Sequence, residues 1–325
     1  LLGIQRGGRL MAQTIERGSA GGGSLRPGPW EVRELRQRRD VRAWLAVDRP
    51  FSAYALGHLE GGLLEHARFW VAEGRGSGAG GLVMHASALG QSMVTVGDPE
   101  AIAAIVSVHP GPRATYLTTA AREHIDALRE AYLVGDVLAM RRMSVTRGEF
   151  APVSGLTRRL RGRDAGRINW LYSIEGGRGR YYPDAIEHAI YYGVVEGDLL
   201  VAVAGTHIVA PNEGVAVVGN VFTHPQYRGR GYAERVTSAV TAELFERGCG
   251  EVVLTVDPQN TPAVAAYTHL GFRPGAAVVE ARLRRRDAFG IAPWGRRTRA
   301  VRRGRTVGTG VELVDARPVL AREDR

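Results

Sequence analysis

The stretch from residue 215 to residue 272 constrains the fold most, because apolar runs alternate there with glycine-rich turns. Val215–Thr223 is apolar and β-branched, which predicts a buried strand that ends at His224-Pro225. The turn after it carries Gly229 and Gly231 and leads directly into an amphipathic helix. The predicted order is the strand Val215–Thr223, a helix over 233–247 that ends at Gly248, a strand over Glu251–Val256, and a short helix through Tyr267 that ends at Gly271-Phe272.

The glycine turn has the properties of a pyrophosphate-binding site. Gly229 and Gly231 allow successive backbone N–H groups to converge on an anion, since no side chains stand in the way. The dipole of the following helix adds about 0.3–1 kcal/mol for each anionic contact. Arg228 and Arg230 place full positive charges beside the turn. The glycine spacing fits neither the Walker A pattern nor the dinucleotide-binding pattern.

Two motifs in this stretch resemble those of the GNAT superfamily of acyl-CoA-dependent N-acyltransferases. Gln226-x-x-Gly229-x-Gly231 matches its pyrophosphate loop. The motif from Asn260 through Ala263 and Tyr267 to Gly271-Phe272 is similar to its second signature. The sequence of residues 219–225 also resembles that of the glycine N-acyltransferase-like branch. The resemblance implies an α/β (α+β) fold, with a mixed, mostly antiparallel sheet flanked by helices, and acetyl-CoA as the acyl-donor substrate.

The resemblance also implies site residues. Tyr267 would be the general acid beside the CoA sulfur, against the alternative of a core aromatic on an amphipathic helix. Asn260 would bind the pantetheine arm, against simple capping of its helix, and the two roles are compatible. The expected CoA-binding residues are Val221, Phe222, Thr223, Gln226, Arg228, Gly229, Arg230, Gly231, Tyr232, Ala233, Asn260, Ala263 and Tyr267.

The general base is less well defined by the residues, although the superfamily often uses a Glu or a held water. His224 is the candidate that titrates near neutrality, but it precedes Pro225 and could serve only to cap the strand. Other polar candidates on or near the two strands are Asn220, Thr255, Asp257, His207 and Glu213. A tyrosine cluster could line an acceptor pocket or merely pack on the sheet; its members are Tyr181, Tyr182, Tyr191 and Tyr192.

The rest of the chain predicts the same order of elements twice, with a join near 146–155. In the first half we expect strands over 30–36, 69–72, 81–85, 92–96, 114–117 and 137–145, and helices over 38–47, 51–64, Pro99–Val108 and 119–131. In the second half we expect strands over 156–160, Tyr191–Glu196, 199–209 and 276–283, and helices capped by Asp164 through Ile174 and over 183–189, besides the stretch above. The hypothesis is a tandem of acetyltransferase-like units.

The first unit lacks the glycine turn at the corresponding place. There the sequence reads Gly97-Asp98-Pro99-Glu100, whose acids would repel a pyrophosphate. The unit is therefore interpreted as a degenerate, structural or substrate-shaping copy. The expected organisation is a flexible leader over 1–29, a degenerate unit over 30–149, a catalytic domain over 150–283 and an Arg-rich tail over 284–325; Met11 could be the true start.

The charge lies mainly at the two ends of the chain. The net charge is +10, with +3 in residues 1–29, +8 in residues 282–325 and −1 between them. A protein that reads nucleic acid through its folded part carries a basic patch there, so nucleic acid is expected only through the tail, which otherwise is a solvated, partly disordered extension. The 43 basic residues are all Arg. The single Cys249 suits a buried structural thiol in a reducing cytosol.

These observations predict a cytoplasmic acetyl-CoA-dependent N-acetyltransferase, acting as a monomer or homodimer on a small amine or amino acid without a metal. No apolar run approaches the length of about 18 residues that a membrane span needs. The alternatives are an acyl-CoA-binding sensor without catalysis, and an RNA-associated protein that acts through its tail.

Overall fold

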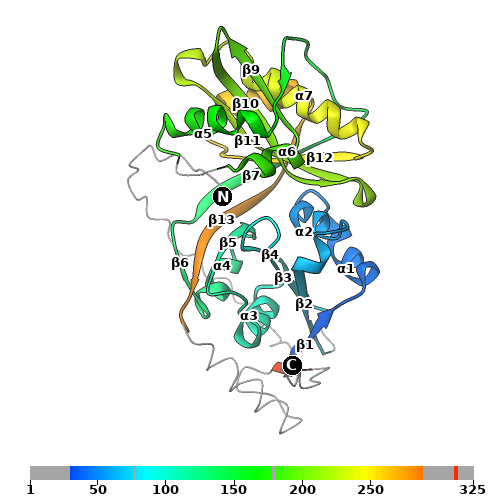
Figure 1. Ribbon diagram of the computed structural model, residues 1–325. Helices are drawn as coiled ribbons and strands as arrows, with labels where there is room; N and C mark the ends of the chain where they lie inside the picture. The colour runs from blue at the N-terminus through cyan, green and yellow to red at the C-terminus, as the bar shows by residue number, and fades with distance from the viewer. Residues whose placement is uncertain (1–29, 76–77, 178–180, 288–310, 314–325) are drawn as a thin grey trace, which may run out of the picture.

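The computed structural model describes residues 30–75, 78–177, 181–287 and 311–313 (Figure 1). Within this part the chain has an α/β fold, in which helices flank a 14-stranded sheet. The strands run in the order β14-β1-β2-β3-β4-β5-β13-β7-β12-β11-β10-β9-β8, with β6 paired to β13. The sheet is mostly antiparallel; its parallel pairs are β1 with β14, β4 with β5, and β11 with β12. The predicted fold class is confirmed.

The elements of the N-terminal half occupy the lower part of Figure 1. They are β1 (Trp30–Leu35), α1 (Arg38–Leu45), α2 (Ala53–Gly57), β2 (Ala67–Gly74), β3 (Gly80–Ala86), β4 (Ser92–Gly97), α3 (Pro99–Val108), β5 (Ala114–Thr119), α4 (His124–Arg129), β6 (Tyr132–Val134) and β7 (Leu138–Thr146).

The elements of the C-terminal half follow in a similar order. They are β8 (Arg158–Arg159), α5 (Ala165–Ser173), α6 (Pro183–His188), β9 (Tyr191–Glu196), β10 (Leu199–Ala210), β11 (Val215–Thr223), α7 (Tyr232–Glu246), β12 (Glu251–Val256), α8 (Thr261–His269), β13 (Arg273–Arg285) and β14 (Val311–Leu313). The run β4-α3-β5-α4 has the same parallel strand pair as the run β11-α7-β12-α8. This equivalence supports our proposal of tandem units.

Two long strands run between the halves and join them into one sheet. β7, which the sequence placed at the end of the first unit, pairs with β12 of the second. β13 pairs with β7 over Arg273 to Glu280, and then with β5 and β6 of the first half. In Figure 1 these strands occupy the region between the upper and lower parts. The boundary predicted at 149/150 therefore does not divide the sheet into two separate sheets.

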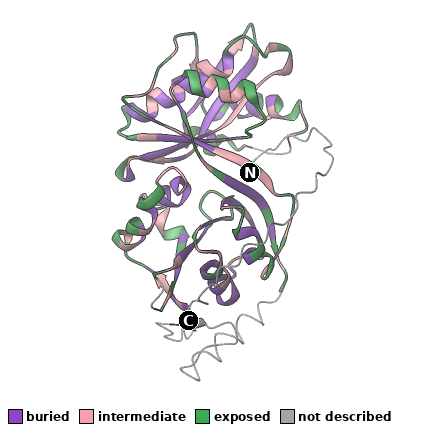
Figure 2. Cartoon of the chain, turned by 180° about the vertical axis from the view of Figure 1, so that it is seen from behind, coloured by how far each residue is buried: buried purple, intermediate pink, exposed green. Residues whose placement is uncertain are grey.

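The buried core is likewise shared between the halves. One cluster holds the buried faces of α1 and α2 together with Ile208, Val215, Val217 and Val253 from the second half. Gly57 of α2 lies so close to Ile208 that a Cβ on it would be 2.1 Å from the Ile208 Cγ2. Figure 2 shows the strands largely buried and the outer faces of the helices exposed. Close packing of α2 on β10 and β11 thus fixes the position of α2 beside the C-terminal half.

Several predicted boundaries are wrong, for local reasons. The helix predicted over 51–64 ends at Gly57, and turns follow in which Gly62 has a φ of +81°. The helix predicted over 119–131 covers only His124–Arg129, because Thr119 still belongs to β5. The strand predicted over 156–160 is reduced to two residues, and β6 was not predicted. Asp164 is the N-cap residue of α5 as predicted, but its carboxylate does not bond to the helix, since it accepts from Arg161 N and pairs with Arg158.

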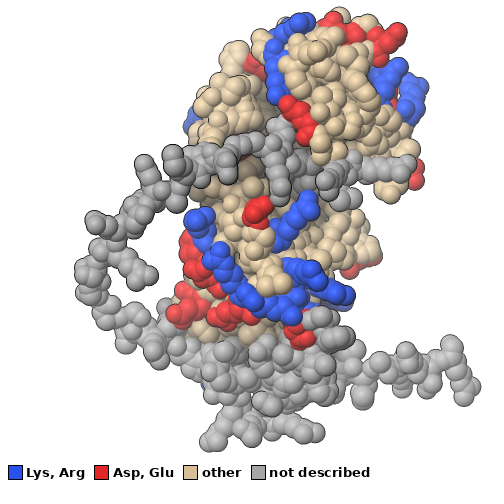
Figure 3. Space-filling view, turned by 90° about the vertical axis from the view of Figure 1, so that its left-hand side faces the viewer, with Lys and Arg blue, Asp and Glu red and all other residues tan. Residues whose placement is uncertain are grey.

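The two ends of the chain lie mostly outside the described residues. The leader 1–29 is among them, and so is most of the proposed tail. β13 continues to Arg285, which is beyond the predicted start of the tail at 284. Within the predicted tail, Val311–Leu313 forms a strand that pairs with β1. On the face shown in Figure 3, arginines and acidic residues lie close to one another. Among the described helices none combines the length and apolarity that a bilayer crossing requires.

Candidate functional site

The site is built around two parallel strands that separate. β11 and β12 are paired from Val215 with Glu251 to Val218 with Leu254, and the pairing stops there. Further along, β11 pairs only with β10, while β12 pairs with β7. The facing edges of the two strands are therefore not paired with each other beyond Val218, which leaves backbone groups that an extended ligand can pair with.

Asn220 lies where the strands separate and has a backbone conformation that is rare outside glycine. Its φ is +55°, in the left-handed region that Asn tolerates better than most residues. Its Oδ1 accepts from the Tyr181 hydroxyl at 2.8 Å, and its Nδ2 donates to the Tyr191 hydroxyl at 2.7 Å. The Tyr172 hydroxyl donates to its carbonyl oxygen. Three tyrosines thus hold the distorted part of β11 in place.

The glycine turn between β11 and α7 is open where an anion would lie. Gly229 and Gly231 have φ values of +77° and +74°, and a Cβ on either would meet no atom within 4 Å. Gly231 is the N-cap of the 15-residue α7, and no side chain caps the helix. The N–H groups of the first turn of α7 are therefore available to a phosphate, as the sequence predicted.

The two arginines of the turn have partners of their own. Arg228 forms an ion pair with Glu175 at 2.5 Å and donates to the Thr223 carbonyl at 3.3 Å. The Arg230 guanidinium lies 5.0 Å from the centre of the Tyr227 ring. Both charges remain beside the turn, but Arg228 would exchange part of its ion pair for a phosphate contact.

Two neighbouring cavities lie along the separated strands. The larger, of about 1140 Å³, contains the glycine turn and the start of α8. The smaller, of about 510 Å³, extends toward the N-terminal half. The larger is lined by all predicted CoA-binding residues except Gln226 and Arg230. The residues common to both cavities are Glu175, Val221, Phe222, Asp257, Gln259, Asn260, Ala263 and Tyr267.

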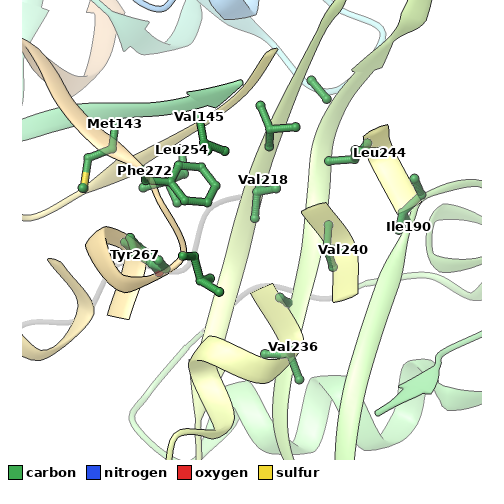
Figure 4. Close-up of a cluster of buried hydrophobic side chains, with 14 of the residues drawn as sticks. Met143, Val145, Ile190, Val218, Val236, Val240, Leu244, Leu254, Tyr267 and Phe272 are labelled. Carbon is green, nitrogen blue, oxygen red and sulfur yellow. The ribbon is translucent and has the colours of Figure 1, made fainter. Parts of the chain in front are cut away.

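The position of Tyr267 is compatible with both roles that the sequence left open. Its ring is 7 % exposed and packs with Phe272, 6.1 Å between ring centres, in the core beneath α7 (Figure 4). The residue also lines both cavities, and its hydroxyl has no hydrogen-bond partner among the described residues. Burial raises the pKa of Tyr267, so the hydroxyl keeps its proton at neutral pH.

Asn260 lies at the other side of the opening between the cavities. It is the N-cap of α8, and its Oδ1 accepts from Ala263 N at 3.3 Å. The residue also lines both cavities. The capping role is therefore seen directly, and its side chain stands beside the space in which a pantetheine arm would lie.

The structure does not bring His224 to these cavities, although the sequence proposed it as the base. Its Nδ1 accepts from Gln226 N at 3.2 Å, and its ring stacks on Trp170 and meets the Tyr227 ring edge to face. The imidazole therefore caps the turn after β11. The position of His224 directly before Pro225 had suggested a capping role as the alternative to catalysis. Gln226 is exposed and contributes this N–H.

The other candidates for the base have different places. Glu213 is buried in an ion pair with Arg42, and Thr255 accepts from Arg142. Asp257 lines both cavities and its Oδ1 accepts from Gln259 N at 2.8 Å. His207 lines the smaller cavity, where its Nδ1 is 2.6 Å from the Tyr54 hydroxyl. Burial lowers the pKa of His207 to about 4, so this imidazole is neutral at pH 7 and a weak base.

The tyrosine cluster divides into two parts. Tyr181 and Tyr191 hold Asn220, and Tyr181 lines the smaller cavity. Tyr182 is 62 % exposed, and Tyr192 lies under the Arg159 guanidinium. Tyr172, which the sequence reasoning missed, lines the cavity as well. No local signal distinguished it from the other residues of the amphipathic α5.

A buried polar group at the junction of the halves was also missed. Glu280 of β13 lines the smaller cavity, and its Oε2 accepts from the Tyr116 hydroxyl at 2.7 Å. Tyr54 of α2 lines the same cavity. Arg142 is fully buried, with its guanidinium 5.2 Å from the centre of the Tyr54 ring. One signal was present in the sequence: a single acid interrupts the apolar run Ala276 to Ala281.

Comparison with known proteins agrees with this geometry. Residues 166–272 match the model of the Acetyltransferase (GNAT) family. The mycothiol acetyltransferase of Catenulispora acidiphila is 42% identical over 69 residues, which are 20% of this chain and 22% of that protein. The mycothiol acetyltransferase of Nocardia farcinica is 43% identical over 60 residues, 18% of this chain and 20% of that protein. The chain thus matches about a fifth of the length of these curated relatives.

Among solved structures, a Drosophila protein has a TM-score of 0.56 at 16% identity, covering 78% of this chain and 98% of its own. This likeness concerns the fold alone. The family match covers residues 166–272, and the fold likeness extends over most of the chain.

Proposed function

We propose that the protein transfers an acetyl group from acetyl-CoA to the primary amine of a small molecule. The observation that carries the proposal is a pair of neighbouring cavities with a common wall, one at the open glycine turn and one that extends toward the N-terminal half. Such a pair of cavities accommodates a pyrophosphate at one end and an acceptor at the other, with the thioester between them. Tyr267 lies on the wall common to both cavities.

The proposed chemistry uses position more than reactive groups. The N–H groups at the start of α7 would bind the pyrophosphate, and the free edge of β11 would pair with the pantetheine arm. Alignment of amine and thioester can supply about 7–11 kcal/mol of the barrier reduction. When the amine nitrogen bonds to the thioester carbon, the carbon–sulfur bond breaks and the thiolate takes the proton of Tyr267. The amide nitrogen loses a proton, which restores the tyrosine.

The acceptor is left open by the comparisons. The relatives that act as mycothiol acetyltransferases match only a fifth of their own length. The sequence 219–225 resembles the glycine N-acyltransferase-like branch, which favours a small amine or amino acid. Both suggestions concern the acceptor and leave the donor site the same.

Thiol release from acetyl-CoA in the presence of a panel of amines tests the proposal. We expect turnover with at least one amine, and no turnover in the variant Gly231→Asp, whose carboxylate would enter the phosphate site. A protein that binds CoA in calorimetry but releases no thiol with any amine would instead be a non-catalytic acyl-CoA sensor.

A further inference from the structure

The smaller cavity ends at the junction of the two halves, and the N-terminal half supplies part of its wall. Tyr54 comes from α2, and Val137 to Met140 come from the start of β7 and the residue before it. Glu280 comes from the part of β13 that leads into the first half and is 5 % exposed. The acceptor end of the site is therefore built jointly by segments far apart in the chain.

Glu280 is positioned as a group that acts on a ligand. Its Oε2 is held by the Tyr116 hydroxyl, whereas its Oε1 has no hydrogen-bond partner among the described residues. Oε1 is also not among the fully buried unpartnered oxygens, and Glu280 is one of the residues that line the smaller cavity. A buried carboxylate in a cavity wall, with one oxygen anchored and the other unpartnered, is suited to bind an ammonium group.

The charges around Glu280 include the buried guanidinium of Arg142, whose positive charge lowers the pKa of the Glu280 carboxyl. The Arg142 guanidinium on β7 donates hydrogen bonds to the hydroxyls of Thr255 and Thr119. It forms no ion pair within 4 Å in the described part of the chain. Arg282 on β13 lies near Tyr116, and Tyr54 on α2 stays protonated because burial raises its pKa. No described lining residue of the smaller cavity is an arginine.

The remaining carboxylates of the cavity are less suited to the role. Glu175 is paired with Arg228, and Asp257 is exposed and bonded to the turn that follows it. The other walls are aromatic, with the rings of Tyr54, Tyr172, Tyr181, Phe222 and Tyr267. Aromatic faces attract an organic cation and repel an anionic group.

From this arrangement we propose that Glu280 is the general base, and that the acceptor enters as an organic ammonium ion bearing an apolar or aromatic group. The inference rests on the proposed acetyl transfer. The ammonium gives one proton to the Glu280 carboxylate, and the resulting neutral amine attacks the thioester. That proton leaves to water after the turnover, so one proton is released for each amide formed. Tyr116 is a positioning residue that holds the carboxylate.

Binding gives a test that does not depend on turnover. Calorimetry on CoA-saturated protein at pH 7 compares phenethylammonium chloride with 2-phenylethanol, which has the same skeleton without charge. We expect the ammonium to bind at least about tenfold tighter than the alcohol, since a charged hydrogen bond replaces a neutral one. Glu280→Gln should abolish this preference, and the exposed Glu73→Gln should keep it. A preference that is absent in the wild type, or survives in Glu280→Gln, would overturn the proposal.

The pH profile of acetyl transfer to phenethylamine separates a catalytic from a structural role. Burial raises the pKa of Glu280, and the bond from Tyr116 and the charge of Arg142 both lower it. Tyr116→Phe should therefore shift the acidic limb of kcat/KM to higher pH. Glu280→Gln should lower kcat/KM by about 10²–10⁴-fold. An unmoved limb in Tyr116→Phe, with only a lower melting temperature, would make the pair structural. An intact ammonium preference without thiol release would refute acetyl transfer and leave the Glu280 site standing.

Discussion

The left-handed conformation of Asn220 allows a prediction whose contributions can be separated. Asn220→Ala removes two side-chain hydrogen bonds, to the hydroxyls of Tyr181 and Tyr191. Each is worth about 0.5–1.5 kcal/mol net. Alanine at a φ of +55° adds about 1 kcal/mol of strain. The expected destabilisation is about 2–4 kcal/mol, which corresponds to a fall in Tm of roughly 5–10 °C.

Asn220→Gly is the matched control, because it removes the same hydrogen bonds and relieves the backbone. It should be more stable than Asn220→Ala by about 1 kcal/mol. Thermal unfolding monitored by circular dichroism measures both variants. Both should also raise the acceptor KM, because Tyr181 lines the smaller cavity. Equal melting temperatures for the two variants would refute the strain argument, and wild-type values for both would refute the role of Asn220 altogether.

Two further predictions concern a proton donor and a buried histidine. Tyr267→Phe should lower kcat and kcat/KM by about 10²–10⁴-fold and leave the Kd of acetyl-CoA unchanged, since the hydroxyl acts only as the thiolate leaves; full turnover or lost binding would contradict this. Burial lowers the pKa of His85 from 6.5 to about 4. As the pH falls, His85 is protonated in the unfolded chain at a higher pH than in the folded protein. The free energy of unfolding should therefore fall by about 3 kcal/mol between pH 6.5 and pH 4. His85→Gln should reduce this acid sensitivity in denaturant titrations and the exposed His66→Gln should not; equal curves would exclude His85.

Local signals were enough to predict most elements. The β-branched runs predicted Val215–Thr223 and Glu251–Val256 at their observed bounds, since a buried strand needs such residues regardless of its partner. Pro99 after Asp98 gave the start of α3, because the cap is formed within one turn. Some failures were local, as in the helix that ends at Gly57 before turns in which Gly62 has a φ of +81°.

Pairing partners and the site between the halves could not be predicted in this way. The position of β7 next to β12 depends on contacts over more than a hundred residues, which no periodicity encodes. Glu280 and Tyr116 meet for the same reason, at a separation of 164 residues. His224 was chosen for its intrinsic pKa, but its place beside a proline turns the ring toward the backbone of Gln226. Most of the residues predicted to bind CoA line one cavity, because one contiguous segment of the chain supplies them.

The two halves differ in the corresponding turn, and this difference predicts a single CoA site for each chain. After β4, the Asp98 carboxylate accepts from Glu100 N at 2.7 Å and Ala101 N at 3.3 Å, so a side chain already takes the place of a phosphate at the start of α3. A Cβ on Gly97 would lie 2.3 Å from the Gly80 carbonyl, so this glycine serves close packing. A side chain at Gly97 would therefore disturb the packing, so a substitution there cannot serve as the control for the CoA-binding experiment.

Calorimetric titration with CoA should give one site per chain. Gly231→Asp should abolish binding, because it adds a negative charge and a left-handed strain of about 1–2 kcal/mol where the pyrophosphate would lie. Asp98→Ser is the matched control: a serine still caps α3, so the fold survives, and removal of the charge should leave the affinity unchanged because no CoA binds there. A stoichiometry of two, or a changed affinity in Asp98→Ser, would mean that the first half has kept a working phosphate site. A Gly231→Asp variant that binds normally would move the pyrophosphate away from α7, and with it the assignment of both cavities.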